Sequence, residues 1–347
     1  MPVQELPPNE LLAVYGLDPR SIAPIEMGNI NKTYLATRAG ARFILQWLNP
    51  IFGPKIHDDI EAVTAHLAAK GMLTPRLVRT SNGSLWATAR DGGVWRLMTY
   101  IDGRVLSAGA TPAVCRTGGA LLGRFHRAVA DLDHVFSSTR PGVHDTARHL
   151  AHLAEVLRTH SQHAAFKEVE PVGRAILTSA AALPPVCELP ARIVHGDPKL
   201  NNIVFSDGGE ALCLIDLDTL SRMTIPIELG DAFRSWCNPT GEDVVEARFD
   251  LELFEAGVAG YASATRGFIS RTEADAIPTA VETITLELAA RFSADALEES
   301  YFGWNRRAFP SASAHNLHRA RSQLALARSI AAVRAELQRL VELYLWA

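Results

Sequence analysis

The sequence is poor in cysteine and nearly balanced in charge, and both properties narrow the possible classes of protein. Its 347 residues include 4 cysteines, which lie far apart and form no C-x-x-C pair, so we expect a reducing, cytoplasmic environment. The formal net charge of −4 gives no electrostatic reason to expect binding to nucleic acid or to an anionic membrane. The sequence also shows no internal repeat and no low-complexity segment, which argues against a repeat architecture.

Long hydrophobic runs are also missing. No apolar run approaches the length that is needed to span a membrane. The first residues, MPVQELPPNELLAVYGL, have no basic region followed by a long apolar run, so no secretory signal is predicted. A chain of this length can bury a large core, and we expect it to divide into two lobes.

The residue pattern changes near residue 100, which divides the chain into two parts. The sequence predicts an α+β fold with a small β-rich lobe over 1–101, a hinge at about 100–104 and a helical lobe over 102–347. In the first part, we predict a helix over 9–17, an inserted helix over 58–70, and strands over 33–37, 42–48, 85–89 and 94–101. Two hairpin turns, at 39–40 and 90–93, are predicted between neighbouring strands. In the second part, the predicted helices are 112–131, 144–160, 168–182, 226–237, 243–264, 272–299 and 315–345.

The strongest functional signal comes from two short segments in the second part. The first reads IVHGDPKLNN over 193–202 and places Asp197 and Asn202 five residues apart on a predicted loop. Asp216 follows an apolar run at 211–215. In kinases the loop Asp accepts the proton of the substrate hydroxyl, while the loop Asn and the later Asp hold Mg²⁺ on the phosphates. A single loop Asp is most often a turn former or a helix cap, but the joint spacing favours a kinase.

These residues also carry a family resemblance. His195-Gly196-Asp197 with Asn202 and Ile215-Asp216 resembles the aminoglycoside phosphotransferase and choline kinase superfamily, which implies a bilobal protein-kinase-like fold. Within this superfamily the chain is most similar to the N-acetylhexosamine 1-kinase group. The matching segments are Ile215-Asp216-Leu217-Asp218-Thr219, Gly28-Asn29-Ile30-Asn31 with Thr33, Phe43-Ile44-Leu45-Gln46, His315-Asn316-Leu317 and Arg319-Ala320-Arg321.

The nucleotide-binding part of the small lobe departs from the usual kinase pattern. The predicted phosphate-covering turn at 28–31 has one glycine instead of G-x-G-x-x-G, and by itself it reads as an ordinary hairpin turn. Gln46 stands where a strand lysine is expected, and it cannot form the usual ion pair with a helix glutamate, for which Glu61 is the natural candidate. We expect nucleotide contacts from Gly28, Asn29, Asn31, Thr33 and Gln46, and from the hinge residues Tyr100 and Ile101.

Several residues around the motif have more than one interpretation. Lys199 either neutralises charge on the transferred phosphoryl group or is a solvent-facing loop residue. His195 is expected to brace the loop backbone, and the resemblance implies that Asp231 supports the catalytic loop by accepting backbone hydrogen bonds. Asp218 either binds metal or caps the turn. The predicted Mg²⁺ ligands are the oxygen-bearing side chains of Asn202, Asp216 and Asp218.

The acceptor site is predicted in the helical lobe. The segment 301–335 contains no Asp or Glu but several Arg and His residues. The resemblance favours a place in the acceptor pocket for one of Arg319 and Arg321. Arg291 and Asp295, four residues apart, either pair with each other or hydrogen-bond to sugar hydroxyls. An acid-free segment with arginine side chains suits a neutral or N-acetylated sugar, or an acceptor with a carboxylate, better than a polycationic aminoglycoside or choline.

These observations together predict an enzyme that transfers the γ-phosphoryl group of ATP to a sugar hydroxyl, with Mg²⁺ as cofactor. Asp197 is the predicted base and contacts the acceptor, for which the resemblance favours the anomeric hydroxyl. An amino-alcohol, homoserine or aminoglycoside kinase of the same fold is the alternative, since a fold does not determine the substrate. A nucleotide-binding pseudokinase is a further alternative, suggested by Gln46. No partner beyond ATP and a small acceptor is predicted, and the oligomeric state is left open.

Overall fold

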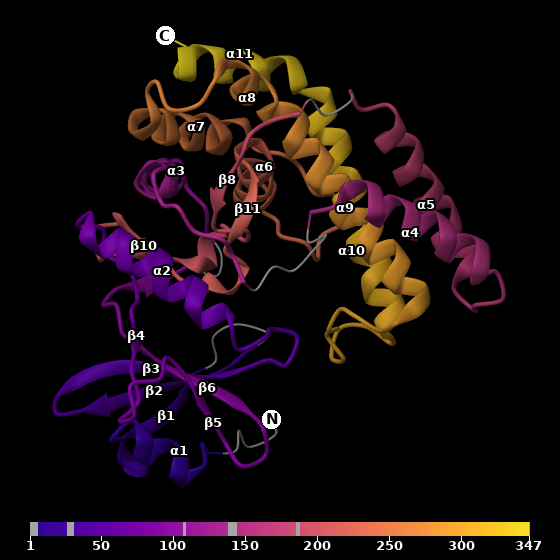
Figure 1. Cartoon of the computed structure of the whole chain (residues 1–347). Helices are drawn as coiled ribbons and strands as arrows, with labels where there is room; N and C mark the ends of the chain where they lie inside the picture. Colours follow the sequence, from indigo (N-terminus) through magenta and orange to yellow (C-terminus); the bar gives the residue numbers. More distant parts are fainter. Residues whose placement is uncertain (1–5, 26–30, 107–108, 138–143, 185–187, 347) are drawn as a thin grey trace.

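The chain folds into two lobes that differ in secondary structure (Figure 1). The computed structural model describes residues 6–25, 31–106, 109–137, 144–184 and 188–346. The small lobe is built mainly on a β-sheet and contains the N-terminus, and the large lobe is mainly helical and contains the C-terminus. This arrangement confirms the predicted α+β class. Among the described residues, no helix is both long enough and apolar enough to cross a membrane.

An antiparallel sheet forms the small lobe. Its strands follow the order β1-β2-β3-β6-β4, and β5 pairs with β6. Ala39 and Gly40 both have a positive φ and form the turn between β2 and β3, which confirms the predicted hairpin. The elements are α1 (Asn9–Val14), β1 (Ile22–Ile25), β2 (Lys32–Arg38), β3 (Ala41–Leu48), β4 (Leu77–Val78), β5 (Ala87–Thr88) and β6 (Val94–Thr99).

Helix α2 (Ile56–Ala69) connects the cores of the two lobes. Four of its apolar residues recur at a helical spacing that places them on one face: Ile56, Ile60, Val63 and Leu67. All four are buried in the same hydrophobic cluster as residues of α3 (Pro112–Val129) in the large lobe. The position of α2 is therefore fixed by the large lobe as well as by its own chain neighbours.

The chain passes between the lobes at Gly103. The φ of this residue is 151°, and a Cβ atom here would lie 2.5 Å from the carbonyl oxygen of Phe205. Glycine is therefore required by both the backbone angle and the space. Directly afterwards, β7 (Arg104–Val105) pairs with β9 (Ile203–Phe205) of the large lobe. The lobe boundary that we propose, between residues 101 and 102, lies next to this crossing.

The large lobe packs helices around two small β-structures. A three-stranded sheet has the order β10-β9-β7, and β8 pairs with β11 in a two-stranded ribbon. Helix α3 approaches α7 so closely that a Cβ atom at Gly260 would lie 1.9 Å from the carbonyl oxygen of Arg116. The strands are β8 (Ala191–Val194), β10 (Ala211–Leu214) and β11 (Ser221–Thr224), and the described helices are α4 (Thr146–Thr159), α5 (Phe166–Ala181), α6 (Ile225–Trp236), α7 (Leu251–Thr265), α8 (Arg271–Asp275), α9 (Ile277–Glu298), α10 (Ala312–Ala332) and α11 (Arg334–Trp346).

Three of the helices predicted in the large lobe begin much later than expected or are divided in the structure. The helix expected over 243–264 begins only at Leu251, because the Asp250 carboxylate caps it by accepting two backbone N–H groups of the first turn. The helix expected over 272–299 is divided into α8 and α9, because a proline, Pro278, is tolerated only in the first turn of a helix. The last one, expected over 315–345, is divided into α10 and α11.

Candidate active site

The predicted catalytic loop lies between β8 and β9. It begins with His195, directly after β8 ends. Gly196 has a φ of 85°, and a Cβ atom at this position would lie 2.2 Å from the carbonyl oxygen of Thr219. Because only glycine satisfies both constraints, the loop can pass directly beside the turn that follows Asp216.

Asp197 is contacted by two of the residues that were predicted with it. Lys199 Nζ lies 2.8 Å from Oδ1 of Asp197, and Asn202 Nδ2 donates to Oδ2 at 3.1 Å and to the backbone oxygen of Asp197 at 2.8 Å. Burial alone would lower the pKa of Lys199, but the carboxylates of Asp197 and Asp231 hold that pKa above its ordinary value. A charged ammonium therefore lies beside the predicted base.

The backbone of the catalytic loop is held by Glu228 of α6. Its buried carboxylate accepts hydrogen bonds from the backbone N–H groups of His195 and Gly196, both at 2.9 Å. The His195 ring bonds through Nε2 to the carbonyl oxygen of Ile215 at 2.8 Å, which confirms that this histidine braces the loop. The loop is thus fixed from α6 and from the end of β10.

Asp231 does not have the supporting role that the family resemblance implied. It lies one helical turn after Glu228 and pairs with Arg234 at 2.9 Å. Burial alone would raise the pKa of Asp231, but Arg234, His144 and Lys199 lower that pKa to about 2. The expectation is wrong because the two acids of this helix have different neighbours: Glu228 reaches the loop backbone, whereas Asp231 interacts with charged side chains.

Asp216 follows β10 in a left-handed backbone conformation, with φ 59° and ψ 57°. Such a conformation is uncommon for residues other than glycine and persists only where the surroundings determine it. Asp216 is exposed to solvent, yet the protein groups around it perturb its carboxyl. Desolvation by these groups, followed by the carboxylates of Asp218 and Asp197, raises the pKa of Asp216 to about 6. A bound cation would relieve this crowding of negative charge.

Asp218 has its partners in the small lobe. Arg96 of β6 contacts both oxygens of the Asp218 carboxylate, with Nη2 at 3.0 Å from Oδ2, and Asn31 Nδ2 donates to Oδ2 at 2.7 Å. Gln46 Oε1 accepts hydrogen bonds from Nε and Nη2 of Arg96 at 2.9 and 2.8 Å, and Gln46 Nε2 donates to Thr33 Oγ1 at 3.1 Å. The structure thus brings three predicted nucleotide-binding residues into one network with a predicted metal ligand.

Sequence analysis missed Arg96, although a signal was present. Arg96 lies inside a predicted strand between Trp95 and Leu97, and all three side chains are buried. A buried arginine needs a carboxylate partner, and Asp218 provides it. Glu61, the helix acid expected opposite position 46, pairs instead with two arginines, Arg76 at 3.2 Å and Arg79 at 3.3 Å.

Four predicted nucleotide-binding residues remain, two from the expected turn and two from the expected hinge. Gly28 and Asn29 are outside the described residues. The backbone N–H of Tyr100 donates to the carbonyl oxygen of Arg42 at 3.4 Å, and the Arg42 guanidinium lies 4.3 Å from the centre of the Tyr100 ring. Adenine binding by the backbone at Tyr100 and Ile101 stays a prediction.

Arg291 and Asp295 on α9 do not pair with each other. The Asp295 carboxylate accepts hydrogen bonds from three backbone N–H groups over 300–302, at 2.8 to 2.9 Å, and from Asn316 Nδ2 at 2.8 Å. Arg291 lies 5.5 Å from the ring centre of Tyr301. Asp295 therefore holds the loop after α9, and the ion pair that the sequence left open is not formed.

Arg319 and Arg321 on α10 have different surroundings. Arg319 Nε lies 3.1 Å from Asp243 Oδ1, and Arg319 Nη1 donates to the carbonyl oxygen of Gly303 at 2.9 Å. Arg321 has a more distant partner, Glu168 at 3.7 Å, and its side chain is 43 % exposed against 19 % for Arg319. Of the two predicted acceptor residues, Arg319 therefore has the closer partners and the less exposed side chain.

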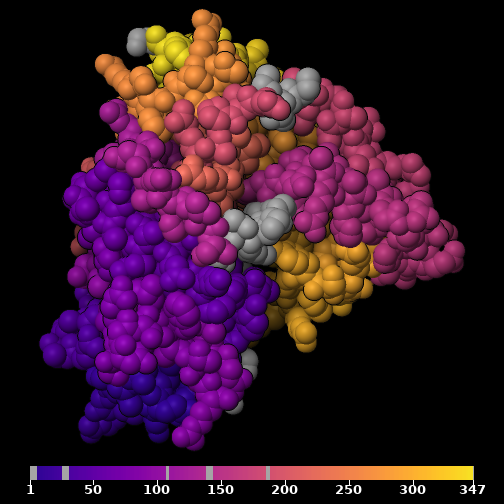
Figure 2. All heavy atoms as spheres, in the orientation of Figure 1, coloured from indigo at the N-terminus to yellow at the C-terminus, as the bar shows by residue number. Residues whose placement is uncertain are grey.

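Charged contacts continue from the catalytic loop to α10. Asp231 raises the pKa of Lys199 through its charge, and Arg234 pairs with both Asp231 and Glu242. The next residue in the chain, Asp243, pairs with Arg319. The α9–α10 hairpin that carries this end of the network reaches down towards the small lobe (Figure 1). In Figure 2 the outline of the molecule is indented between the small lobe and the amber end of this hairpin.

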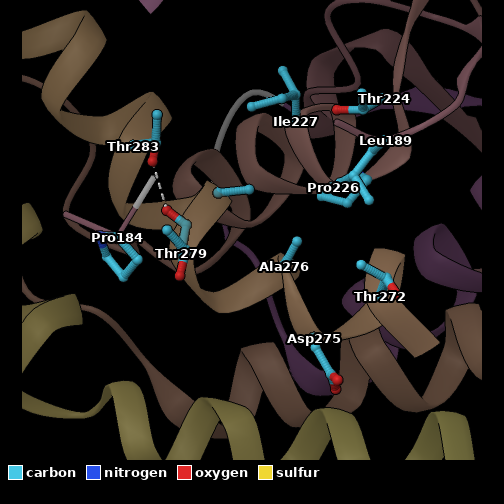
Figure 3. A pocket seen from close by; sticks show the side chains of 11 residues that line it. Pro184, Leu189, Thr224, Pro226, Ile227, Thr272, Asp275, Ala276, Thr279 and Thr283 are labelled. Atoms are coloured by element: carbon cyan, nitrogen blue, oxygen red, sulfur yellow. Dashed lines mark hydrogen bonds between the residues drawn. The ribbon is translucent and has the colours of Figure 1, made fainter. Parts of the chain in front are cut away.

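A separate pocket of about 270 Å³ lies at the starts of α6 and α9 (Figure 3). Threonine hydroxyls and apolar side chains line it, and the Thr283 hydroxyl donates to the carbonyl oxygen of Thr279 at 2.8 Å. None of the predicted site residues lines this pocket. It is therefore distinct from the constellation around Asp197.

Comparison with known proteins places the chain in a class, the phosphotransferases with a two-lobed, kinase-like fold. More narrowly, residues 21–264 match the phosphotransferase enzyme family (APH), and the chain belongs to this family. The protein is accordingly a small-molecule phosphotransferase with a hydroxyl group as acceptor.

Solved structures similar to this chain share its fold over nearly the whole length. They include the amicoumacin kinase hAmiN in complex with AMP-PNP, Ca²⁺ and Ami, at 16% identity, with 89% of each chain covered and a TM-score of 0.62. An aminoglycoside phosphotransferase from Alicyclobacillus acidocaldarius matches at 16% identity, 98% of each chain and a TM-score of 0.63. A microcompartment-associated aminopropanol kinase matches at 16% identity, 94% of this chain, 97% of the other and a TM-score of 0.61. These likenesses establish the fold and do not select an acceptor.

Proposed function

We propose that the protein transfers the γ-phosphoryl group of ATP to the anomeric hydroxyl of a hexose or an N-acetylhexosamine. The observation that carries the transfer chemistry is the Asp197 carboxylate with Lys199 Nζ at 2.8 Å and Asn202 Nδ2 at 3.1 Å. An oriented carboxylate can accept the proton of an incoming hydroxyl, and an ammonium beside it can stabilise negative charge on the phosphoryl group.

We propose that the contacts of Asp197 are rearranged when the acceptor binds. Both oxygens of Asp197 have partners, one in Lys199 and one in Asn202. The acceptor hydroxyl needs one of these oxygens. Lys199 has the longer and more flexible side chain, so we propose that it moves from Asp197 to the phosphoryl group while Asn202 keeps the carboxylate in place.

Asn202 and Asp216 are the proposed ligands of Mg²⁺. Their donor atoms are oxygens, which Mg²⁺ prefers. The pKa of Asp216 is raised by desolvation and, after that, by the carboxylates of Asp218 and Asp197, which a cation would offset. Among the described residues, no three His, Cys, Asp or Glu side chains are grouped to hold a metal ion. This fits an ion that takes few protein ligands and completes its shell with phosphate oxygens and water. When bound, Mg²⁺ would neutralise charge on the phosphates.

The pairing of acidic side chains supports a neutral acceptor. Asp243 pairs with Arg319, and Asp231 pairs with Arg234. The Glu287 carboxylate is bound by the His144 ring and by the Thr146 hydroxyl. A polycationic acceptor needs carboxylates that are not already neutralised. The resemblance to the N-acetylhexosamine 1-kinase group supports a sugar for the same site, and the half-exposed ring of Tyr301 offers it an apolar face.

An acceptor panel tests this proposal. ADP formation from Mg²⁺·ATP would be measured with hexoses, N-acetylhexosamines, ethanolamine, choline, homoserine and an aminoglycoside. We expect activity with a sugar and a product that has lost its reducing end and releases phosphate in mild acid. Activity confined to amino alcohols or aminoglycosides, or phosphate on a primary hydroxyl, would contradict the proposal. Nucleotide binding without ADP formation from any acceptor would point to the pseudokinase alternative.

A further inference from the structure

Gln46 and Arg96 are register partners on β3 and β6, and their side chains form one unit. Gln46 Oε1 accepts two hydrogen bonds from the Arg96 guanidinium, at 2.9 and 2.8 Å. A lysine at position 46 would place its ammonium against this guanidinium, and like charges at such a distance repel. The presence of Arg96 therefore explains why the usual strand lysine is replaced by glutamine.

Arg96 also links the small lobe to the large lobe. It contacts both oxygens of the Asp218 carboxylate, and the two side chains are each 1 % exposed. Asn31 Nδ2 donates to the same carboxylate at 2.7 Å. A buried arginine that binds a carboxylate through two nitrogens fixes both its position and its orientation. Asp218 is therefore engaged within the protein through both oxygens.

The turn that contains Asp218 also contains Asp216 in its left-handed conformation. From the large lobe, His195 holds this turn on both sides: its Nε2 bonds to the carbonyl oxygen of Ile215, and its carbonyl oxygen accepts from Thr219 Oγ1, both at 2.8 Å. From the small lobe, Arg96 holds it through Asp218. A residue other than glycine keeps this conformation only where several contacts determine it.

We infer that Arg96 is a positioning residue for the metal-binding turn and acts through Asp218 on the Asp216 carboxylate. In this chain the bridge from Gln46 through Arg96 to Asp218 takes the place of the strand lysine and helix glutamate of other kinases. The inference rests on the proposed metal role of Asp216 and does not depend on which acceptor is used. Metal-dependent nucleotide binding should therefore require Arg96, although its guanidinium is buried behind Asp218.

The test is a double variant, Arg96→Met with Asp218→Leu, which removes both charges and leaves neither one buried without a partner. The matched control is Arg334→Met with Glu282→Leu, an ion pair between α11 and α9. AMP-PNP binding would be measured by calorimetry with Mg²⁺ and with EDTA, beside the thermal unfolding midpoint. We expect binding in Mg²⁺ to weaken about 10- to 100-fold in the first variant and to stay unchanged in EDTA. The control pair should bind as the wild type does.

A single variant, Arg96→Lys, covers the case in which the double variant does not fold. Lysine keeps the charge but cannot bind Asp218 through two nitrogens while it donates to Gln46, so we expect a smaller loss in the same direction. Binding within about twofold of wild type in a folded Arg96 variant overturns the inference. Asp216→Asn, measured in parallel, separates the two failures. If Asp216→Asn loses metal-dependent binding, only the Arg96 inference is wrong; if it binds as wild type, the proposed metal site is wrong too.

Discussion

Asp197 is held in one orientation by two neighbours, Asn202 and Lys199, whose side chains differ in length and flexibility. The short side chain of Asn202 donates both to the carboxylate and to the backbone oxygen of Asp197, so it fixes the residue twice. Lys199 contributes charge and can move. The backbone beneath them is fixed by Glu228. Such an arrangement would place the proposed proton acceptor accurately before substrate binds, and placement is the main source of rate in phosphoryl transfer.

Replacing Asp197 by Asn should therefore affect turnover far more than nucleotide binding. An amide has nearly the same shape but cannot accept the hydroxyl proton, so we expect kcat to fall about 10²- to 10⁴-fold. The affinity for AMP-PNP should stay close to that of wild type, which calorimetry would check. Asp207→Asn, in the exposed turn after β9, is the matched control and should keep full activity. Near-normal kcat in Asp197→Asn would show that the base lies elsewhere.

At the scale of elements, the helices of the large lobe depend on glycine where their backbones meet. A Cβ atom at Gly260 of α7 would lie 1.9 Å from a backbone oxygen of α3, and one at Gly119 of α3 would lie 2.2 Å from the carbonyl oxygen of Gly257. Backbone atoms cannot move aside as a flexible side chain can. Helix α3 also contributes to the core on which β8 and β10 rest, and these strands lead into the catalytic loop and the turn at Asp216.

Gly260→Ala should destabilise the protein because α3 and α7 would be forced apart. We expect a loss of about 1–3 kcal/mol or more in the free energy of unfolding, measured with urea. Gly53→Ala is the matched control, since a Cβ atom there meets nothing within 4 Å, and its effect should stay within about 0.5 kcal/mol. Equal stability of the two variants would mean that the helix pair adjusts more easily than its backbone contact suggests.

The start of α2 contains a histidine that should make stability depend on pH. His57 is fully buried, stacks on Trp86 with ring centres 5.3 Å apart, and bonds through Nδ1 to the carbonyl oxygen of Pro54. Burial, helped by the nearby Arg96, lowers the pKa of His57 to about 4. Because the folded state then binds this proton less readily than the unfolded state, the contribution of His57 to stability is complete above about pH 6.5 and is lost as pH falls towards 4.

His57→Gln should remove this part of the acid sensitivity. The free energy of unfolding of the wild type should fall by on the order of 2–3 kcal/mol between pH 7 and 4 through His57 alone. The variant should show a correspondingly smaller fall, measured by urea unfolding at several pH values. His152→Gln, at a half-exposed position, is the control and should follow the wild-type curve. Parallel curves for wild type and His57→Gln would show that His57 is not buried in its neutral form.

At the scale of the whole molecule, two polar networks meet at the site. One runs from the small-lobe sheet through Arg96 to the turn at Asp216. The other runs from Lys199 through α6 to Glu242, and the next residue in the chain, Asp243, pairs with Arg319 on α10. The first reaches the side where nucleotide and metal are proposed to bind. The second reaches the side where the acceptor is proposed to bind. Substitutions at the far end of the second network should therefore affect the acceptor and spare ATP.

Arg319→Ala is the test of this division. We expect the acceptor KM to rise about 10- to 100-fold while the KM for ATP changes little, because Arg319 fixes Asp243 and the carbonyl oxygen of Gly303 on the acceptor side. Arg321→Ala, two residues along the same helix but exposed and loosely paired, is the control and should behave as wild type. Equal damage to both KM values would assign Arg319 a purely structural role.

The sequence by itself determined the class of enzyme and the outline of the fold. Asp197, Asn202 and Asp216 lie close together in sequence, and two short paired strands separate them. Asn202 therefore contacts Asp197, and its backbone oxygen accepts from the N–H of Ile215, next to Asp216. The hairpin at Ala39-Gly40 and the helix that begins at Pro112 could also be predicted, because turns and helix caps depend on only a few neighbouring residues.

Only the tertiary structure decided which residues that are distant in the sequence contact one another. Arg96 and Asp218 are 122 positions apart, and Arg319 and Asp243 are 76 apart. No local sequence pattern predicts which acid pairs with which base. An ion pair forms wherever packing brings two charged side chains together and removes water from them. The same reason explains why Glu228 supports the catalytic loop and Asp231 does not. Both acids lie within one turn of α6, so the sequence alone does not say which of them reaches the loop. The direction in which each side chain points depends on how α6 packs against β8.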